Sequence, residues 1–280
     1  MSDKLQLFEN RKIRSAWDDE KEEWYFSVVD VVGALSESSN PTDYLKKMRK
    51  REPALGEYLG TNCPQVAMET TNGKKRKTLA GNMECIFRII QSIPSSKAEP
   101  FKLWLAKVAK ERIDEEIDPQ KAIDRARETY RRKGYSEEWI NARMKGIETR
   151  VALTTEWKEH GVKDRQYAML TDIIHRGTFE VSVKEHKAIK GLTKENLRDN
   201  MTLVESALTT LAEATATEIT RAQNPKNLTE NKTIAKTSGT IAGNARKDIE
   251  AKTGKKVVSR KNANHLIEEE RQRKLKTGLG

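Results

Sequence analysis

The chain has 280 residues and is strongly basic, with 53 Lys and Arg against 42 Asp and Glu and a formal net charge of +11. A charged fraction of 34% with only 6% aromatic residues indicates a heavily solvated protein whose natural partners are polyanions such as nucleic acid. The sequence has no apolar run near the roughly 18 residues of a membrane-spanning helix, no signal-peptide core and only two cysteines, so we expect a cytoplasmic protein with no membrane partner.

The first predicted elements are a short β-hairpin and a helix. Residues 12–17 alternate weakly, the acidic stretch 18–23 makes the turn, and the aromatic run 24–26 returns as the second strand. Ser27 and Asp30 match the capping signature that opens a helix. The apolar positions of this helix recur at helical spacing and are Val28, Val31, Val32 and Leu35.

A second helix follows a five-residue break. Gly33 in the first helix allows a neighbouring element to approach closely, and Asn40 with Pro41 is a good N-cap and first helical residue. The pattern of residues 42–52 buries an apolar face and turns a basic face outward. The cations on that outward face are Lys46, Lys47, Arg49, Lys50 and Arg51.

The densest positive charge directly follows an Asn72-Gly73 dipeptide, which is the strongest short signal for a β-hairpin. With these two residues at the centre of a type I′ turn, Glu69 pairs with Arg76. Strand alternation then predicts one face that is apolar at its base and charged at its tip, made of Val66, Met68, Lys75, Lys77 and Leu79. Two interpretations follow: a solvated hairpin with an ordinary Glu69–Arg76 cross-strand pair, or a basic wing that contacts phosphates.

The charge is segregated along the chain, which favours polyanion binding. Residues 41–81 carry nine Lys and Arg against four acidic residues, and residues 226–280 carry 14 against six. The chain has a helix, a break, a basic helix and a basic hairpin in that order, and this order resembles a winged helix-turn-helix DNA-binding domain. The alternative interpretation of the basic residues is a solvated charged face with no ligand. The predicted DNA-contacting residues are Lys46, Lys47, Arg49, Lys50, Arg51, Lys74, Lys75, Arg76 and Lys77. They would supply mainly salt-dependent phosphate contacts. Of these residues, only the arginines have a guanidinium group, which is best suited to donate two hydrogen bonds to guanine.

Two further helices complete the N-terminal half. Gly81 or Asn82 caps the first, and a Pro-Ser-Ser break at 94–96 precedes the second. Aromatic residues at helical spacing are usually core residues. We therefore expect the stripe of the second helix to be buried, with its members Phe101, Trp104, Leu105, Val108 and Ile113.

Three runs in this half, EWYFSVVDVVGAL, LKKMRK and CIFRIIQSIPSSKAEPFKLWLAKVAKERI, resemble the N-terminal domain of the BRO family. The positions that match the family pattern are Trp24, Phe26, Asp30, Val31, Leu35, Ser92, Ala98, Phe101, Trp104 and Ile113. The resemblance covers roughly residues 5–115. It implies a DNA-binding domain of the kind found in phage antirepressors and large DNA viruses.

The C-terminal half resembles bacterial DNA-damage-inducible protein D in three segments, at residues 195–202, 211–219 and 241–262. The double glycine of that pattern is replaced here by Ser238-Gly239-Thr240, which is a mild departure. This second resemblance implies a modulator of RecA-type recombinase filaments. The basic faces would then contact a filament or single-stranded DNA instead of an operator.

The C-terminal half has the pattern of helices throughout. Its most distinctive feature is an apolar repeat with spacings of 4, 3, 4 and 3, made of Leu197, Met201, Val204, Leu208 and Leu211. The repeat is shorter than a coiled coil requires, so we expect it to pack inside the domain, with a homo-oligomer as the alternative. The basic tail beyond Pro225 is expected to be helical or partly disordered.

The sequence shows little sign of an active site. Its four histidines and two cysteines have no metal-ligand or nucleophile spacing, and no phosphate-binding loop motif occurs. We therefore predict no catalytic residue, metal or cofactor. The acid-rich run 111–118 could form a metal-dependent nuclease site, although its acids are suitably spaced for ordinary ion pairs along a helix.

These observations predict an α+β protein. A small mixed BRO-type DNA-binding domain spans residues 1–115, a helical domain spans 116–223, and a basic helical or partly disordered region spans 224–280. We expect a non-enzymatic, DNA-binding regulator of phage antirepressor or DNA-damage-response type. Its expected partners are duplex or single-stranded DNA, with a RecA-type recombinase, a phage repressor or a second copy as further possibilities.

Overall fold

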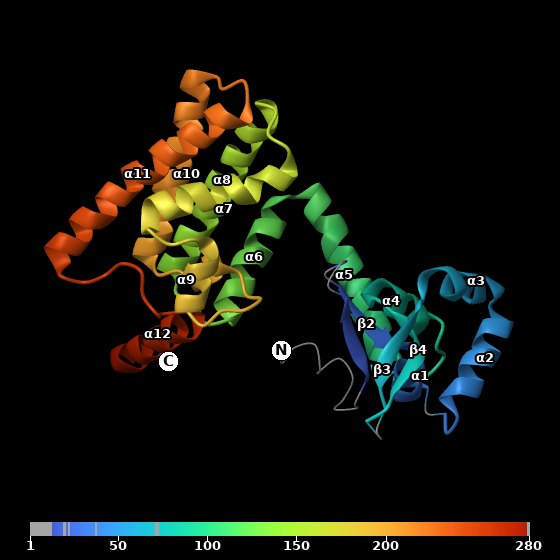
Figure 1. Cartoon of the computed structure of the whole chain (residues 1–280). Helices are drawn as coiled ribbons and strands as arrows, with labels where there is room; N and C mark the ends of the chain where they lie inside the picture. The colour runs from blue at the N-terminus through green and yellow to red at the C-terminus, as the bar shows by residue number, and fades with distance from the viewer. Residues whose placement is uncertain (1–12, 19–20, 22, 37, 71–72, 279–280) are drawn as a thin grey trace. The chain divides into compact units, whose positions relative to one another are not determined.

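The chain folds into two compact units, unit 1 (Met1–Pro119) and unit 2 (Gln120–Gly280) (Figure 1). The computed structural model describes residues 13–18, 21, 23–36, 38–70 and 73–278. Unit 1 combines strands with helices, whereas the described part of unit 2 is built from helices. The predicted α+β fold class, with a small mixed N-terminal part and a mainly helical C-terminal part, is confirmed.

The described residues of unit 1 contain an antiparallel sheet with the strand order β1-β2-β4-β3. Its strands are β1 (Ser15–Asp18), β2 (Glu23–Ser27), β3 (Gln65–Glu69) and β4 (Lys75–Gly81). The predicted first hairpin is confirmed, with Ala16 of β1 opposite Tyr25 of β2. Ala16 and Val66 come from the two edge strands, and both pack on the buried cluster of Tyr25, Met68 and Ala80. Since side chains of both edges meet over one face, the sheet curves into a half-barrel.

The opposite face of the sheet is covered by helices. The helices of unit 1 are α1 (Val28–Leu35), α2 (Pro41–Arg51), α3 (Pro53–Asn62), α4 (Met83–Gln91) and α5 (Glu99–Ile117). Phe26 of β2 and Leu79 of β4 pack against the main core of this unit, which is built chiefly from α1 to α4. The core is apolar and its central residues are fully buried, among them Val31, Leu55 and Ile86.

Local sequence signals set the starts of three helices as predicted. The side chains of Ser27, Asn40 and Asn82 each accept a hydrogen bond from the backbone N–H three residues later. The expected close approach at Gly33 also occurs, because a Cβ there would lie 2.9 Å from Cγ of Pro41. Gly33 therefore lets the first turn of α2 pack directly against α1.

The apolar stripe of α5 is less buried than the sequence predicts. Phe101 packs against the core, but Trp104 is 43% exposed and Ile113 is 59% exposed. Trp104 leans on Phe87 of α4, with 5.6 Å between the ring centroids. The expectation that Trp104 is a core residue is wrong, because only the first turns of α5 reach the packed helices of unit 1.

Unit 2 is a helical assembly in which α8 and α11 cross at close range (Figure 1). Its elements are α6 (Gln120–Arg132), α7 (Glu137–Glu159), α8 (Asp164–Phe179), α9 (Val183–Ile189), the short 3₁₀ helix η2 (Leu197–Asn200), α10 (Leu203–Gln223), α11 (Leu228–Thr253) and α12 (Ala263–Thr277). None of the helices in the described part of the chain is both long enough and apolar enough to span a membrane.

The crossing of α8 and α11 depends on three glycines. A Cβ added to Gly239 would lie 2.6 Å from the carbonyl oxygen of Ile174, and one added to Gly243 would lie 2.3 Å from that of Gly177. Both positions face backbone atoms, which cannot move aside as a flexible side chain can. The two helix backbones therefore touch directly, and no larger residue fits between them.

The predicted apolar repeat of residues 197–211 does not form one continuous stripe. Leu197, Met201 and Leu208 are buried in a common cluster, whereas Val204 and Leu211 are 42% and 41% exposed. The repeat is interrupted because η2 ends before α10 begins, so its members do not share one helix. The prediction that the repeat packs inside the domain is therefore correct for Leu197, Met201 and Leu208 and wrong for Val204 and Leu211.

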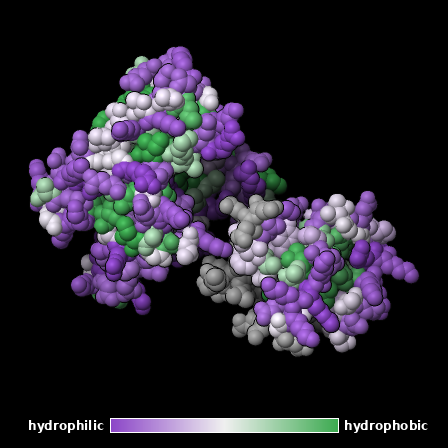
Figure 2. Space-filling view, in the orientation of Figure 1, coloured by the Kyte–Doolittle hydropathy of each residue, from purple (hydrophilic) through white to green (hydrophobic). Residues whose placement is uncertain are grey.

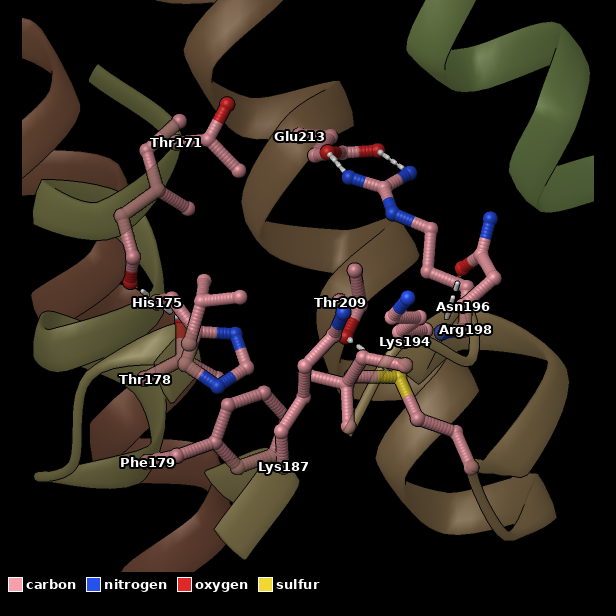
Figure 3. Close-up of a pocket in the computed structure, with 14 residues that line it drawn as sticks. Thr171, His175, Thr178, Phe179, Lys187, Lys194, Asn196, Arg198, Thr209 and Glu213 are labelled. Atoms are coloured by element: carbon pink, nitrogen blue, oxygen red, sulfur yellow. Dashed lines mark hydrogen bonds and ion pairs between the residues drawn. The ribbon is translucent and has the colours of Figure 1, made fainter. Parts of the chain in front are cut away.

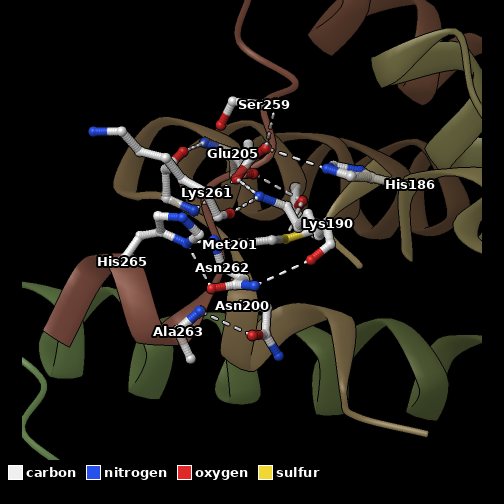
Figure 4. A network of polar contacts seen from close by, with 12 residues as sticks. His186, Lys190, Asn200, Met201, Glu205, Ser259, Lys261, Asn262, Ala263 and His265 are labelled. Atoms are coloured by element: carbon white, nitrogen blue, oxygen red, sulfur yellow. Dashed lines mark hydrogen bonds and ion pairs between the residues drawn. The ribbon is translucent and has the colours of Figure 1, made fainter. Parts of the chain in front are cut away.

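A polar network ties the segment after α11 to the centre of unit 2 (Figure 4). The buried carboxylate of Glu205 accepts a hydrogen bond from Nζ of Lys190 at 2.9 Å and lies 3.2 Å from Nε2 of His186. Nζ of Lys190 also donates to the carbonyl of Lys261 at 2.5 Å, and Nδ2 of Asn262 donates to the carbonyl of Lys190 at 3.1 Å. These bonds anchor the residues that lead into α12.

Candidate nucleic-acid interface

Helix α2 carries the first group of predicted DNA-contacting residues. Leu45 and Met48 are buried against the core of unit 1, so the opposite face of the helix turns to solvent. The five cations on that side are all exposed: Lys46, Lys47, Arg49, Lys50 and Arg51. Hydrophilic residues dominate the visible surface around smaller hydrophobic areas (Figure 2). The structure thus presents the predicted basic face to solvent.

These five cations differ in the partners they have. Nζ of Lys47 pairs with Asp43 at 2.9 Å, and Nη2 of Arg51 donates to the carbonyl of Ser92 at 2.8 Å. Arg49 has a single long hydrogen bond of 3.5 Å, to a backbone carbonyl of α3. Lys46 and Lys50 differ from the other three, because their side chains form neither an ion pair nor a hydrogen bond with any described residue. Their full charges are available to an approaching phosphate.

The β3–β4 hairpin exists, but its register differs from the prediction by one residue. Glu69 lies opposite Lys75, and Met68 lies opposite Arg76, whereas the sequence suggested Glu69 opposite Arg76. The predicted Glu69–Arg76 pair is therefore wrong. A one-residue shift also moves every side chain of one strand to the other face of the sheet.

The turn explains the register. Thr71 and Asn72 lie outside the described residues, but the bonds on either side of them are clear. The N–H of Thr70 donates to the carbonyl of Lys74 at 2.8 Å, and the N–H of Gly73 donates to the carbonyl of Thr70 at 2.9 Å. Gly73 has φ +73°, the left-handed conformation that glycine tolerates best. The strands thus close at the Thr70–Lys74 pair, with three residues between them. A two-residue turn would have paired residue 71 with Lys74, and this difference accounts for the shift in register.

The corrected register places the cations of the hairpin on both of its faces. Lys75 and Lys77 share a face with Leu79, while Arg76 shares the other face with buried Met68. The predicted single face of five residues is thus wrong, because Met68 packs into the half-barrel away from Lys75 and Lys77. All four cations, Lys74, Lys75, Arg76 and Lys77, are exposed and form no ion pair with a described residue.

An ion pair that the sequence analysis missed fixes the sheet to α1. Nε and Nη2 of Arg14 donate to the two carboxylate oxygens of Asp30 at 2.8 and 2.7 Å. Arg14 also donates to the hydroxyls of Ser27 and Thr78 at 3.2 and 3.4 Å. Burial tends to raise the pKa of Asp30, but the hydrogen bonds from Arg14 outweigh it, and the pKa is lowered. The residues lie 16 positions apart, so no local pattern reveals the pair.

The structure gives the acid-rich run 111–118 an ordinary structural role. It lies at the end of α5, where Lys107 pairs with Glu111 at 3.8 Å and Lys110 pairs with Asp114 at 2.5 Å. Within the parts of the chain that the structure describes, no group of three or more His, Cys, Asp or Glu is placed to hold a metal ion. Cys63 is buried, and burial together with the neighbouring Cys85 raises its pKa to about 12, so the thiol stays protonated.

Unit 2 brings together two histidines that the sequence analysis regarded as separate. Nε2 of His175 lies 3.1 Å from Nδ1 of His186, whose other ring nitrogen meets Glu205. Burial, with the adjacent His186, lowers the pKa of His175 to about 3. This pair joins α8 to α9 and lies outside the predicted DNA-contacting elements.

The comparisons with known proteins concern unit 1. Residues 12–112 match the family model described as the BRO family, N-terminal domain. Nine of the ten residues on which the sequence resemblance rests lie inside this match, and Ile113 lies one position beyond it. No curated protein matches the chain significantly. The matched segment holds β1 to β4, α1 to α4 and most of α5, with all nine predicted DNA-contacting residues. This chain therefore carries a BRO family N-terminal domain at residues 12–112.

Proposed function

We propose that this protein is a DNA-binding regulator of phage antirepressor or DNA-damage-response type, and that unit 1 contacts DNA. The observation that carries the proposal is the set of exposed cations whose side chains form neither an ion pair nor a hydrogen bond with a described residue. They lie on two elements of a unit that matches a domain family of DNA-binding regulators. The set comprises Lys46 and Lys50 on α2 and Lys74, Lys75, Arg76 and Lys77 around β4.

The chemistry of these residues favours contacts to the phosphate backbone. Lysine ammonium groups act as point charges, which neutralise phosphates and release condensed counterions. Base contacts would fall to the arginines, because a guanidinium can donate two hydrogen bonds to guanine. Arg51 already donates to Ser92. Arg49 and Arg76 are therefore the better candidates for sequence-specific contacts.

The remaining expectations form part of the same proposal. We place the protein in the cytoplasm and assign it no enzymatic activity. A phage repressor, a RecA-type recombinase or a second copy of the chain would be its protein partner. The recombinase alternative depends on the resemblance of the C-terminal segments alone, and the binding experiment below distinguishes it from direct DNA binding.

The test is a binding titration of the full chain against duplex DNA, single-stranded DNA and recombinase-coated single strands, at salt concentrations of about 50–200 mM. The proposal expects binding to naked DNA with a steep salt dependence. Binding only to the recombinase-coated strand would replace it by the recombinase alternative. An absence of binding to all three would contradict both.

A further inference from the structure

Unit 2 contains a pocket of about 390 Å³ that the proposed DNA contacts do not use. It lies between α8, α9, η2 and α10, and its volume falls in the usual range for small-molecule sites (Figure 3). Part of its wall is apolar, formed by Ile174, Phe179, Val183, Leu197 and Met201. The pocket can therefore hold the nonpolar part of a ligand as well as a charged group.

The charged groups that line this pocket are mainly positive. The charged lining residues are Lys187, Lys194 and Arg198 with one carboxylate, that of Glu213. Glu213 is buried, and it is held by Arg198 from one side and by Nη1 of Arg150 at 3.2 Å from another. Two guanidinium groups thus offset one carboxylate. A net positive charge remains in the pocket, and it favours an anion.

Lys187 is the cation best placed to meet that anion. It projects from α9 toward the middle of the pocket, near Thr209 (Figure 3). The side chain is half-buried and forms no ion pair with a described residue. An ammonium group that is partly removed from water without a counter-charge is less stable than a paired one. A bound anion would supply that counter-charge.

Neighbouring acids and histidines do not take this role. The carboxylate of Glu205 is already held by Lys190 at 2.9 Å and lies 3.2 Å from His186. His175 lines the pocket, but its pKa is lowered to about 3 by burial and by His186, so its ring is neutral near pH 7. The positive charge inside the pocket therefore comes from lysine and arginine.

An open groove of about 1080 Å³ continues from this pocket and shares Lys187 and Arg198 with it. Further cations line the groove, and they are Arg143, Arg150, Arg176 and Lys184. Arg176 pairs with Asp172 at 2.7 Å, whereas Lys184 forms no ion pair with a described residue. Arg143 and Arg150 are also paired, with Asp199 at 2.7 Å and Glu213 at 3.2 Å, so Lys184 is the further cation of the groove that can add charge for a ligand.

We propose that this pocket binds the phosphate group of a nucleotide, either free or at the end of a single strand, with Lys187 as its charge partner. The apolar wall then contacts the base or sugar. Asn196, which lines both the pocket and the groove, adds an amide donor. The proposal concerns unit 2 only and is independent of DNA binding by unit 1.

Calorimetric titration of the full chain with inorganic phosphate, adenosine monophosphate, a short oligothymidylate and succinate tests this proposal. We expect binding of adenosine monophosphate, which Lys187→Met weakens about ten- to a hundredfold, as loss of a charge-assisted hydrogen bond does. Lys187→Arg should keep most of the affinity because it keeps the charge. Lys236→Met, an exposed lysine of α11 outside the pocket, is the matched control and should bind like the original protein.

The probes also separate the possible ligands. Equal binding of phosphate and adenosine monophosphate would assign recognition to the phosphate alone, whereas tighter binding of the nucleotide would include the apolar wall. A fall in oligothymidylate affinity in Lys187→Met would extend the site to the strand end. Binding of succinate with no binding of any phosphate probe overturns the proposal, and so does unchanged affinity in Lys187→Met. Thermal melting of each variant shows whether it is folded.

Discussion

Arg14 and Asp30 join the first strand of unit 1 to its first helix through two parallel hydrogen bonds of 2.7 and 2.8 Å. Their side chains are only 32% and 19% exposed, so the pair is partly shielded from water. The same arginine reaches Thr78 of β4, close to the base of the basic hairpin. The pair thus helps to hold the sheet that carries the hairpin against α1.

The first prediction concerns this pair. Asp30→Asn should lower the free energy of unfolding of unit 1 by about 1–3 kcal/mol, because it leaves a partly buried guanidinium without its charged acceptor. Urea unfolding followed by tryptophan fluorescence measures the change. Asp43→Asn is a suitable control, since Asp43 belongs to an exposed ion pair of small expected value. An equal loss in both variants would contradict a special role for Asp30.

The second prediction gives the pH dependence of the same pair. The pKa of Asp30 is lowered in the folded state, so its contribution to stability is present above the unfolded value of about 3.9. This contribution is lost as the pH falls through the lower folded value. The stability difference between the original protein and Asp30→Asn should therefore be constant near neutral pH and shrink below about pH 4. A difference that grows with acidity would contradict the assigned direction.

The third prediction concerns the hairpin. Changing Lys74, Lys75, Arg76 and Lys77 together to Ala should flatten the slope of log K against log salt by roughly three to four units for DNA binding, if each contacts one phosphate. The fold should persist because these side chains lie outside the core.

A variant with the same loss of charge elsewhere is the control for the hairpin. It changes four exposed cations of unit 2 to Ala: Lys236, Lys252, Lys255 and Arg260. If both quadruple variants flatten the slope equally, overall charge and not the hairpin determines binding. If neither does, the hairpin is an ordinary solvated surface.

The fourth prediction concerns α2, where two substitutions should change DNA affinity in opposite directions. Lys46→Ala with Lys50→Ala should weaken DNA binding and flatten the salt slope by roughly two units. Asp43→Asn should strengthen binding, because it removes a negative charge and releases Lys47 from its 2.9 Å ion pair. Fluorescence anisotropy with a labelled duplex measures both effects. No change in either variant would show that this face of α2 does not meet DNA.

The fifth prediction concerns the crossing of α8 and α11. Gly239→Ala should destabilise unit 2 by about 1–3 kcal/mol, as overpacking does, because the new Cβ would meet a backbone oxygen at 2.6 Å. Gly146→Ala in α7 is the control. Its Cβ would lie 3.6 Å from Oγ1 of Thr210, an ordinary contact, so the better helix propensity of Ala should stabilise by up to about 1 kcal/mol. Thermal melting of the two variants should thus shift in opposite directions.

Much of the local structure was predictable from the sequence because its causes are local. Ser27, Asn40 and Asn82 begin helices through hydrogen bonds to a backbone N–H three residues later, and this spacing can be recognised in any sequence. The exposed basic face of α2 follows in the same way from helical periodicity. Helix α3 was not predicted, because Gly56 and Gly60 weaken its helical signal. Packing of its apolar residues in the core stabilises this helix.

The features that depend on distant residues were decided by the tertiary structure. The Asn-Gly dipeptide is compatible with turns of different lengths, and the strand register is coupled to which side chain enters the half-barrel, where Met68 packs on Tyr25. The exposure of Trp104 depends on how far α5 extends beyond the helices that it packs against.

The pairing of charged residues also depends on the tertiary structure. The sequence alone established a basic, α+β protein with an acidic hairpin followed by a basic one. It could not show which cations are neutralised by neighbours, because ion pairs such as Arg14–Asp30 and the meeting of His175 with His186 join residues from different elements. Only the fold brings these groups together, and it leaves Lys187 half-buried in a pocket without a carboxylate partner among the described residues.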